Sequence, residues 1–116
     1  MSDTAVLEAT RDNFRELVAD GVVLVDVWGP DCRPCLALLP HVEELAVRLA
    51  GELRVVKLEA PKARRLCMEL GLMTLPSFLM FRDGKEVARL SDPALTAIKL
   101  TRWLDEHRAD QQEGVS

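Results

Sequence analysis

The chain has 116 residues, 48% apolar and 29% charged, with 15 basic and 19 acidic side chains for a net charge of -4. This composition predicts one soluble domain with a single core, and the acidic balance and the 4% aromatic content argue against nucleic acid and anionic membranes as partners. No apolar run approaches the roughly 18 residues of a membrane span, no secretory signal is visible, and an odd number of cysteines, 3, is typical of an intracellular chain, so we expect a cytoplasmic protein.

The first half of the chain alternates extended and helical patterns. Thr4 to Glu8 is a candidate edge strand, and apolar residues at helical spacing follow at 14–18. Residues 22–28 are β-branched and almost wholly apolar, as expected of a central strand buried on both faces. The next pattern predicts a long helix from about Cys32 to Ala50, kinked at Pro40 because proline has no N–H to donate.

The second half adds a strand, a helix and a hairpin. Residues 54–59 predict a second central strand, and a helical stripe follows at 63–70. The strands 76–82 and 86–90 are joined by Asp83-Gly84, which is typical of a two-residue hairpin turn.

A last helix, beginning between Asp92 and Thr96, completes the order β-α-β-α-β-α-β-β-α. Strands that alternate with helices predict parallel pairing, and the terminal hairpin adds an antiparallel edge, so the fold class is α/β with a mixed sheet. We expect one domain over residues 1–108 and a flexible polar tail over 109–116.

The segment most informative about function is Trp28-Gly29-Pro30-Asp31-Cys32-Arg33-Pro34-Cys35, where a central strand ends and a helix begins. The carboxyl ends of strands are where open α/β sheets form their sites. Two cysteines with this spacing can close a small disulfide ring, and the free N–H groups and dipole of the helix start favour thiolate at the first sulfur. Thiolate is the attacking species in disulfide exchange, and the second cysteine is placed to attack the mixed disulfide.

A C-x-x-C pair also occurs in zinc sites, which need two further ligands. The candidates are Cys67 and His41, and neither belongs to a second closely spaced pair. We therefore favour redox chemistry, and we expect no metal and no cofactor beyond the Cys32–Cys35 disulfide. Cys67 lies on the apolar stripe of its helix, which favours a buried free thiol over a regulatory one.

Four features carry a family resemblance: the strand that leads into the C-x-x-C helix, Asp26 with Lys57, Pro40 within the long helix, and the segment Thr74-Leu75-Pro76. With these, the chain resembles the thioredoxin family over about residues 5–107. The resemblance implies a thioredoxin fold and a buried carboxylate at Asp26 with a lysine neighbour at Lys57.

The resemblance also implies the roles of the site residues. Cys32 is then the nucleophile and Cys35 the resolving thiol, while Pro76 follows a cis peptide bond and faces the redox pair. The backbone of Leu75 is left free to pair with a substrate strand. Disulfide-containing proteins are the implied substrates and a thioredoxin reductase-like flavoprotein the implied electron donor, and we expect a monomer.

Asp26 has a role that the residues themselves suggest. Strand alternation places it with Leu24 and Trp28, opposite the valines at 23, 25 and 27. A buried carboxylate has a raised pKa, so Asp26 can take the proton of Cys35 as the mixed disulfide resolves, with Lys57 tuning that pKa downward. The alternative is an Asp26–Lys57 pair with a structural role only.

Three positions depart from the family pattern. Asp31 and Arg33 replace the usual Trp and Gly around the first cysteine, whereas the proline before the second is kept, which in the family goes with a reducing protein. We expect Asp31 to cap the helix and Arg33 to favour thiolate and meet acidic substrate surfaces, both modestly because of exposure. Asp92 stands where the family usually has a groove-lining glycine, so we expect it to narrow and charge the groove.

The resemblance implies a thiol-disulfide oxidoreductase that reduces disulfides in other proteins. The three departures from the family pattern predict a restricted set of partners. The alternative is a thioredoxin-fold binding module with little redox turnover. The altered residues around Cys32 favour the module, and the retention of both cysteines, Asp26 and Pro76 together disfavours it. Trp28 is expected to shield the site from below, with a purely core role as the alternative.

Overall fold

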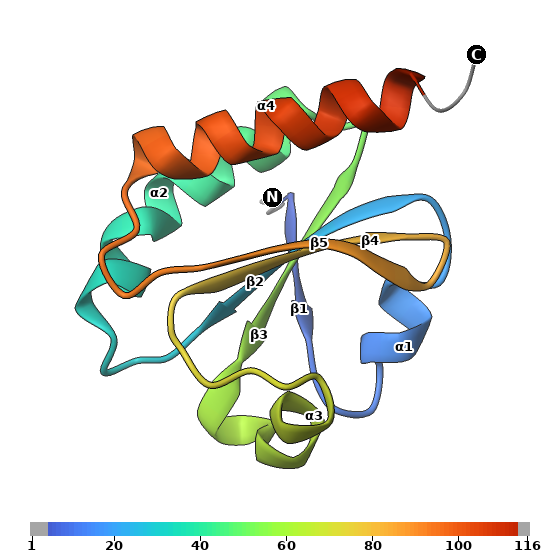
Figure 1. The fold of residues 1–116 in the computed structure, drawn as a ribbon. Helices are drawn as coiled ribbons and strands as arrows, with labels where there is room; N and C mark the ends of the chain where they lie inside the picture. Colours follow the sequence, from blue (N-terminus) through green and yellow to red (C-terminus); the bar gives the residue numbers. More distant parts are fainter. Residues whose placement is uncertain (1–4, 114–116) are drawn as a thin grey trace.

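The computed structural model describes residues 5–113, and the predicted order of elements is confirmed (Figure 1). The elements are β1 (Val6–Ala9), α1 (Phe14–Leu17), β2 (Val22–Trp28), α2 (Arg33–Arg48), β3 (Arg54–Glu59), the 3-10 helix η1 (Ala60–Lys62), α3 (Arg64–Glu69), β4 (Ser77–Arg82), β5 (Lys85–Ser91) and α4 (Ala97–Glu113). The central strands β2 and β3 have the predicted bounds. Thr4, at the start of the predicted first strand, lies outside the described residues.

The strands form one mixed sheet in the order β1-β3-β2-β4-β5. Strand β3 is parallel to β1 and β2, whereas β4 is antiparallel to both β2 and β5. The expectation that antiparallel pairing is confined to the terminal hairpin is therefore wrong. Helix α3 has only 6 residues, roughly 9 Å of helix against roughly 20 Å for a strand of that length. The chain thus re-enters the sheet from the end at which β3 left it (Figure 1).

Each face of the sheet has its own core. Leu24 packs with the buried stripe of α2 and with α4 on one face, while Val23, Val25 and Val27 pack with α1 and α3 on the other. Figure 1 shows α2 and α4 together on one side of the sheet. The predicted alternation along β2 is confirmed, and it directs Asp26 toward the α2 face.

The last turn and helix follow their sequence signals closely. Asp83 and Gly84 both have positive φ, 51° and 87°, as a two-residue hairpin turn requires. Helix α4 begins after Thr96, whose hydroxyl accepts a hydrogen bond from the N–H of Lys99 at 3.2 Å. The helix continues through residues 109–113 of the predicted tail, and residues 114–116 lie outside the described part, so the domain bounds stay a prediction.

Candidate active site

The two cysteines of the C-x-x-C segment form a disulfide at the junction of β2 and α2, with their Cα atoms 5.2 Å apart. Cys35 is 1% exposed, whereas Cys32 is partly exposed. The sulfur of Cys32 accepts a hydrogen bond from the N–H of Cys35 at 3.2 Å. One sulfur is therefore open to a partner molecule and stabilised when negatively charged, and the other is enclosed by the fold.

The start of α2 explains this geometry. Cys32 is the N-cap residue and its carbonyl accepts from the N–H of Leu36 at 3.1 Å, so Pro34 lies in the first turn, where its missing N–H costs no hydrogen bond. The expectation that Asp31 caps the helix is wrong. The sulfur of Cys32 takes the capping position, and Asp31 is an exposed residue outside the helix. Arg33, the first helical residue, is also exposed.

Asp26 is a carboxylate buried beneath α2, with 2% of its surface exposed. Burial raises its pKa from the ordinary value of 3.8 to about 7, and the charge of Lys57 opposes that rise in part. Its Oδ2 atom has no hydrogen-bond partner among residues 5–113. Asp26 points to the face of the sheet that α2 covers. Cys35 is one of the buried residues of α2. A group in this position exchanges its proton readily near neutral pH.

Lys57 lies beside Asp26 in the register of β2 and β3. Its Nζ is 4.0 Å from Glu8 Oε2 and 5.6 Å from the centroid of the Trp28 ring, within the range of a cation–π contact. Trp28 is half-buried, and its Nε1 is buried without a hydrogen-bond partner in the described part of the chain. Trp28 thus lies half-buried at the end of β2, in contact with Lys57.

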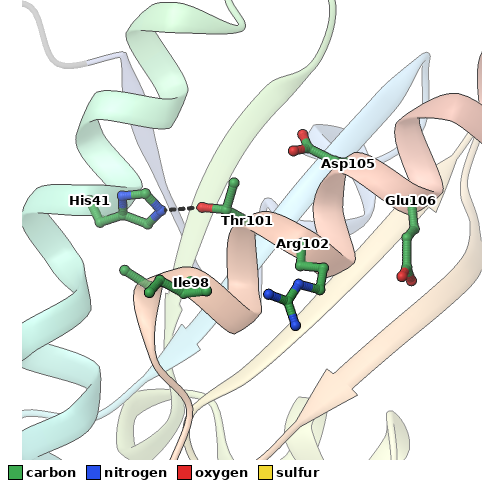
Figure 2. Close-up of a pocket in the computed structure, with 7 residues that line it drawn as sticks. His41, Ile98, Thr101, Arg102, Asp105 and Glu106 are labelled. Carbon is green, nitrogen blue, oxygen red and sulfur yellow. Dashed lines mark hydrogen bonds between the residues drawn. The ribbon is translucent and has the colours of Figure 1, made fainter.

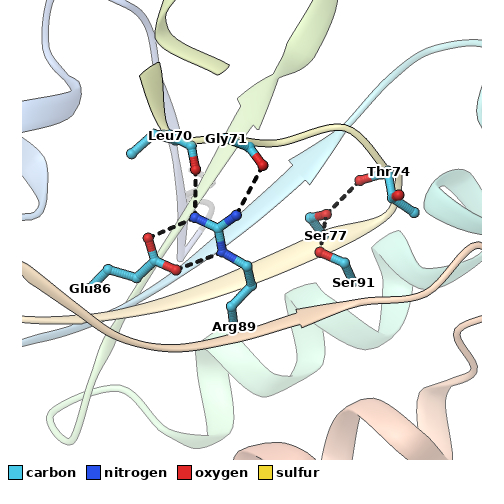
Figure 3. A network of polar contacts seen from close by, with 7 residues as sticks. All are labelled: Leu70, Gly71, Thr74, Ser77, Glu86, Arg89 and Ser91. Carbon is cyan, nitrogen blue, oxygen red and sulfur yellow. Dashed lines mark hydrogen bonds and ion pairs between the residues drawn. The ribbon is translucent and has the colours of Figure 1, made fainter. Parts of the chain in front are cut away.

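The loop before β4, residues 70–76, lies against residues 28–35, which we call the redox segment. Its Leu75–Pro76 peptide bond is cis, and Pro76 is buried. A Cβ on Gly29 would lie 3.2 Å from Leu75 Cδ1, so glycine at this position lets the Leu75 side chain approach. Ser77 donates its hydroxyl to the carbonyl of Thr74 at 2.5 Å (Figure 3). The Leu75 side chain thus lies against Gly29, in the turn that leads to Cys32.

A clamp on this loop has no counterpart among the sequence predictions. Arg89 on β5 donates to the carbonyls of Leu70 at 2.6 Å and Gly71 at 3.1 Å, and Glu86 pairs with the same guanidinium at 2.7 and 2.8 Å (Figure 3). In a regular strand, residues three apart face opposite sides. The register shift between Met80 and Phe81 inserts an extra residue in β5, a β-bulge, so Glu86 and Arg89 meet. No spacing rule predicts such a bulge.

Asp92 lies next to the loop, since its N–H is 3.4 Å from the carbonyl of Pro76. Its carboxylate accepts from the N–H of Ala94 at 2.8 Å and pairs with Lys99 Nζ at 3.0 Å. The hydrogen bond from Ala94, and then that from Lys99, lower the pKa of Asp92. Lys99 therefore offsets part of the charge of Asp92, and the expectation that Asp92 narrows and charges the groove stays a prediction.

The residues considered as zinc ligands lie apart. His41 Nε2 is 2.8 Å from the hydroxyl of Thr101, in a hollow between α2 and α4 (Figure 2). Cys67 is buried in the core on the opposite face of the sheet, where burial raises the pKa of its thiol. Within residues 5–113, no three His, Cys, Asp or Glu side chains are grouped as metal ligands. In the same range, no helix has both the length and the apolar character needed to cross a membrane.

Comparison with known proteins finds similarity to thioredoxins, both in a family model and in individual relatives. The family model described as Thioredoxin matches residues 5–106. A thioredoxin of Acetoanaerobium sticklandii is 34% identical over 94 residues, which cover 79% of this chain and 90% of the relative. A thioredoxin of Bacillus subtilis is 34% identical over 83 residues, 72% of this chain and 80% of the relative. Thioredoxin C-2 of Corynebacterium nephridii is 33% identical over 104 residues, 88% of this chain and 95% of the relative.

Proposed function

This chain belongs to the thioredoxin family, and from that premise we propose that it reduces disulfides in a restricted set of proteins and is itself reduced by a thioredoxin reductase-like flavoprotein. The chain is a thiol-disulfide oxidoreductase. The observation that carries the proposal is the Cys32–Cys35 disulfide, in which Cys32 is partly exposed and Cys35 is buried.

The exchange proceeds in two balanced steps. In the reduced protein, the Cys32 thiolate attacks one sulfur of the substrate disulfide, and the other substrate sulfur leaves as a thiolate. Cys35 then loses its proton and attacks Cys32, which releases the second substrate thiolate and forms the Cys32–Cys35 disulfide. The substrate gains two electrons and the chain loses two, which the flavoprotein restores.

Asp26 is the proposed acceptor of the Cys35 proton. Support comes from its burial on the face that Cys35 occupies and from a pKa of about 7, which matches the proton affinity needed at neutral pH. Lys57 keeps that pKa from rising further. Resolution of the mixed disulfide in Asp26→Asn should lose its dependence on pH near neutrality, and an unchanged pH profile would exclude this role.

The substrate surface is proposed to consist of the redox segment and the adjoining loop. Leu75 would offer its main chain to an extended substrate strand, and Trp28, Pro76 and Asp92 would line the contact. The exposed charges of Asp31 and Arg33, next to the reactive sulfur, are the features that support a restricted partner set. A cytoplasmic location fits this role, because the free thiol of Cys67 suits a reducing compartment. The chain is expected to act as a monomer.

The proposal is tested by the rate at which the protein catalyses reduction of insulin disulfides by dithiothreitol. We expect catalysis to vanish in Cys32→Ser and in Cys35→Ser, and to persist in the matched control Cys67→Ala. Cys35→Ser should accumulate a mixed disulfide through Cys32. If the unaltered chain gives no rate above that of dithiothreitol alone, a binding module with little redox turnover becomes the better description.

A further inference from the structure

A concentration of positive charge lies beside the redox segment. Arg11, Lys62, Arg64 and Arg65 line a hollow of about 250 Å³ together with Pro61, and no carboxylate lines it in the described part of the chain. All four cationic residues are exposed. On a chain with a net charge of -4, this surface has the opposite sign to the whole.

The positive surface continues toward α1. A second hollow of about 610 Å³ shares Arg11 and Arg65 with the first and adds Arg15, together with the carboxylates of Asp12 and Glu69. We call the five cationic residues of the two hollows the basic strip: Arg11, Arg15, Lys62, Arg64 and Arg65.

Much of the charge of the basic strip is free to meet a partner. The Nε atom of Arg11 lies 3.5 Å from Oδ1 of Asp12, and both side chains are exposed. The Nζ atom of Lys62 lies 3.6 Å from Oε1 of Glu59, which is partly buried. The other members have no ion pair with any residue in 5–113: Arg15, Arg64 and Arg65. Free guanidinium groups present planar sets of donors that match carboxylates.

The basic strip borders the redox segment directly. Pro61 lies against Gly29, since its Cδ is 3.8 Å from the position that a Cβ on Gly29 would occupy. Arg11 and Lys62 also line a third hollow together with Trp28, and this hollow has mixed charge because Lys57 and the carboxylates of Glu8, Asp12 and Glu59 line it too. A protein engaged at Cys32 covers roughly 800 Å² of this chain, so it extends over such neighbouring side chains.

The geometry favours a macromolecular partner over a small anion. Exposed side chains bind a single ion weakly because water screens each contact. Several carboxylates on one protein surface interact with the whole strip at once, and the attraction accelerates encounter before any contact forms. We propose that the basic strip docks substrate proteins that carry acidic residues beside their disulfide, which names the partner class of the function proposed above and rests on it.

The test compares two disulfide peptides that share one disulfide loop and differ in their flanks, one rich in Glu and the other in Lys. We expect kcat/KM for the acidic peptide to exceed that for the basic one by about tenfold or more at low ionic strength, and the preference to shrink toward physiological salt. The double variant R64E/R65E should lose or invert the preference. The matched control R48E/R102E changes the net charge equally on α2 and α4 and should keep it.

Equal kcat/KM for the two peptides, or an equal loss of preference in the control, would overturn the proposal. Binding of inorganic phosphate at the strip without any peptide preference would overturn it as well. Reduction of hydroxyethyl disulfide, a small neutral substrate, separates this failure from failure of the redox function, because it depends on Cys32 and Cys35 alone. Thermal unfolding checks that the variants fold. If the charge-reversal variant R64E/R65E does not fold, the neutral variant R64Q/R65Q takes its place.

Discussion

Asp26 lies within strand β2 and Asp92 lies in the turn between β5 and α4, and the two show how surroundings decide what a carboxylate does. Asp26 is enclosed beneath α2, with an oxygen that has no partner among the described residues, and burial raises its pKa to about 7. Asp92, between β5 and α4, is bound by a backbone N–H and by Lys99, which lower its pKa. The buried group is prepared to exchange a proton, and the partnered group holds a turn in place.

The difference also separates function from stability. An ionised carboxylate that is buried without a hydrogen-bond partner destabilises the folded chain, and the proton transfer proposed for Asp26 would account for its presence at this position. Asp92 forms the local contacts that such a residue forms in any turn before a helix. Substitutions in the two regions should therefore differ in sign, in size and in dependence on pH.

The largest effect is expected for Asp26→Asn in the oxidised protein. Below pH 3.8 both the folded and the unfolded chain hold the proton of Asp26, and between 3.8 and about 7 only the folded chain holds it. The free energy of unfolding of the unaltered protein therefore falls by about 1.4 kcal/mol per pH unit in that window. Asp26→Asn avoids this loss, so the variant should be more stable by up to about 4 kcal/mol at pH 8.

Urea denaturation at pH 4 and at pH 8 measures this effect. At pH 4 the two proteins should differ little, because Asp26 is then protonated in the folded state. A stabilisation of the same size at both pH values would mean that the carboxylate does not titrate as its burial indicates.

A smaller effect is expected for Arg89→Gln, because the Arg89 side chain is far more exposed than Asp26. The Arg89 side chain is 33% exposed and binds Glu86 as well as the carbonyls of Leu70 and Gly71. Partial exposure reduces the value of these contacts, so we expect a loss of about 1 kcal/mol in the free energy of unfolding. Hydrogen exchange at residues 70–75 should accelerate, and KM for protein disulfides should rise more than kcat falls.

Lys85→Gln, on the same hairpin, is the control for Arg89. It should leave both hydrogen exchange at residues 70–75 and KM unchanged. If exchange accelerates equally across the whole of β5, Arg89 holds the hairpin rather than the loop.

The smallest effect is expected for Asp92→Asn. The amide oxygen still accepts from the N–H of Ala94, and only the charge opposite Lys99 is lost. Thermal unfolding at neutral pH should hardly change, and the small contribution of the charge should disappear from the unaltered protein as acid protonates Asp92. A marked destabilisation would show that the turn between β5 and α4 depends on the ion pair.

Local patterns in the sequence were enough to predict much of the fold and the centre of the site. Alternation along residues 22–28 placed Asp26 on its face, and the spacing of Cys32 and Cys35 placed the disulfide at a helix start. Contacts between distant segments were beyond these patterns. The β-bulge that joins Glu86 to Arg89 depends on pairing with β4, and the antiparallel course of β4 depends on the length of α3.

The predicted cap of α2 was wrong, and the partner of Asp92 was missed, for a related reason. Asp31 is a good capping residue in isolation, but closure of the disulfide ring brings the sulfur of Cys32 to the free N–H first. Asp92 is an acidic replacement in the sequence, and only the packing of α4 reveals Lys99 as its partner.

The separate cores on the two faces of the sheet have a consequence for the third thiol. Cys67 belongs to the core beside Val25 and Val27, while Cys35 belongs to the buried stripe of α2 on the other face. The five-stranded sheet, a single layer, separates the two faces on which these residues lie. An internal disulfide between Cys67 and Cys35 would require the sheet itself to open. The reduced chain therefore carries three thiols, and the two that pair within the fold are Cys32 and Cys35.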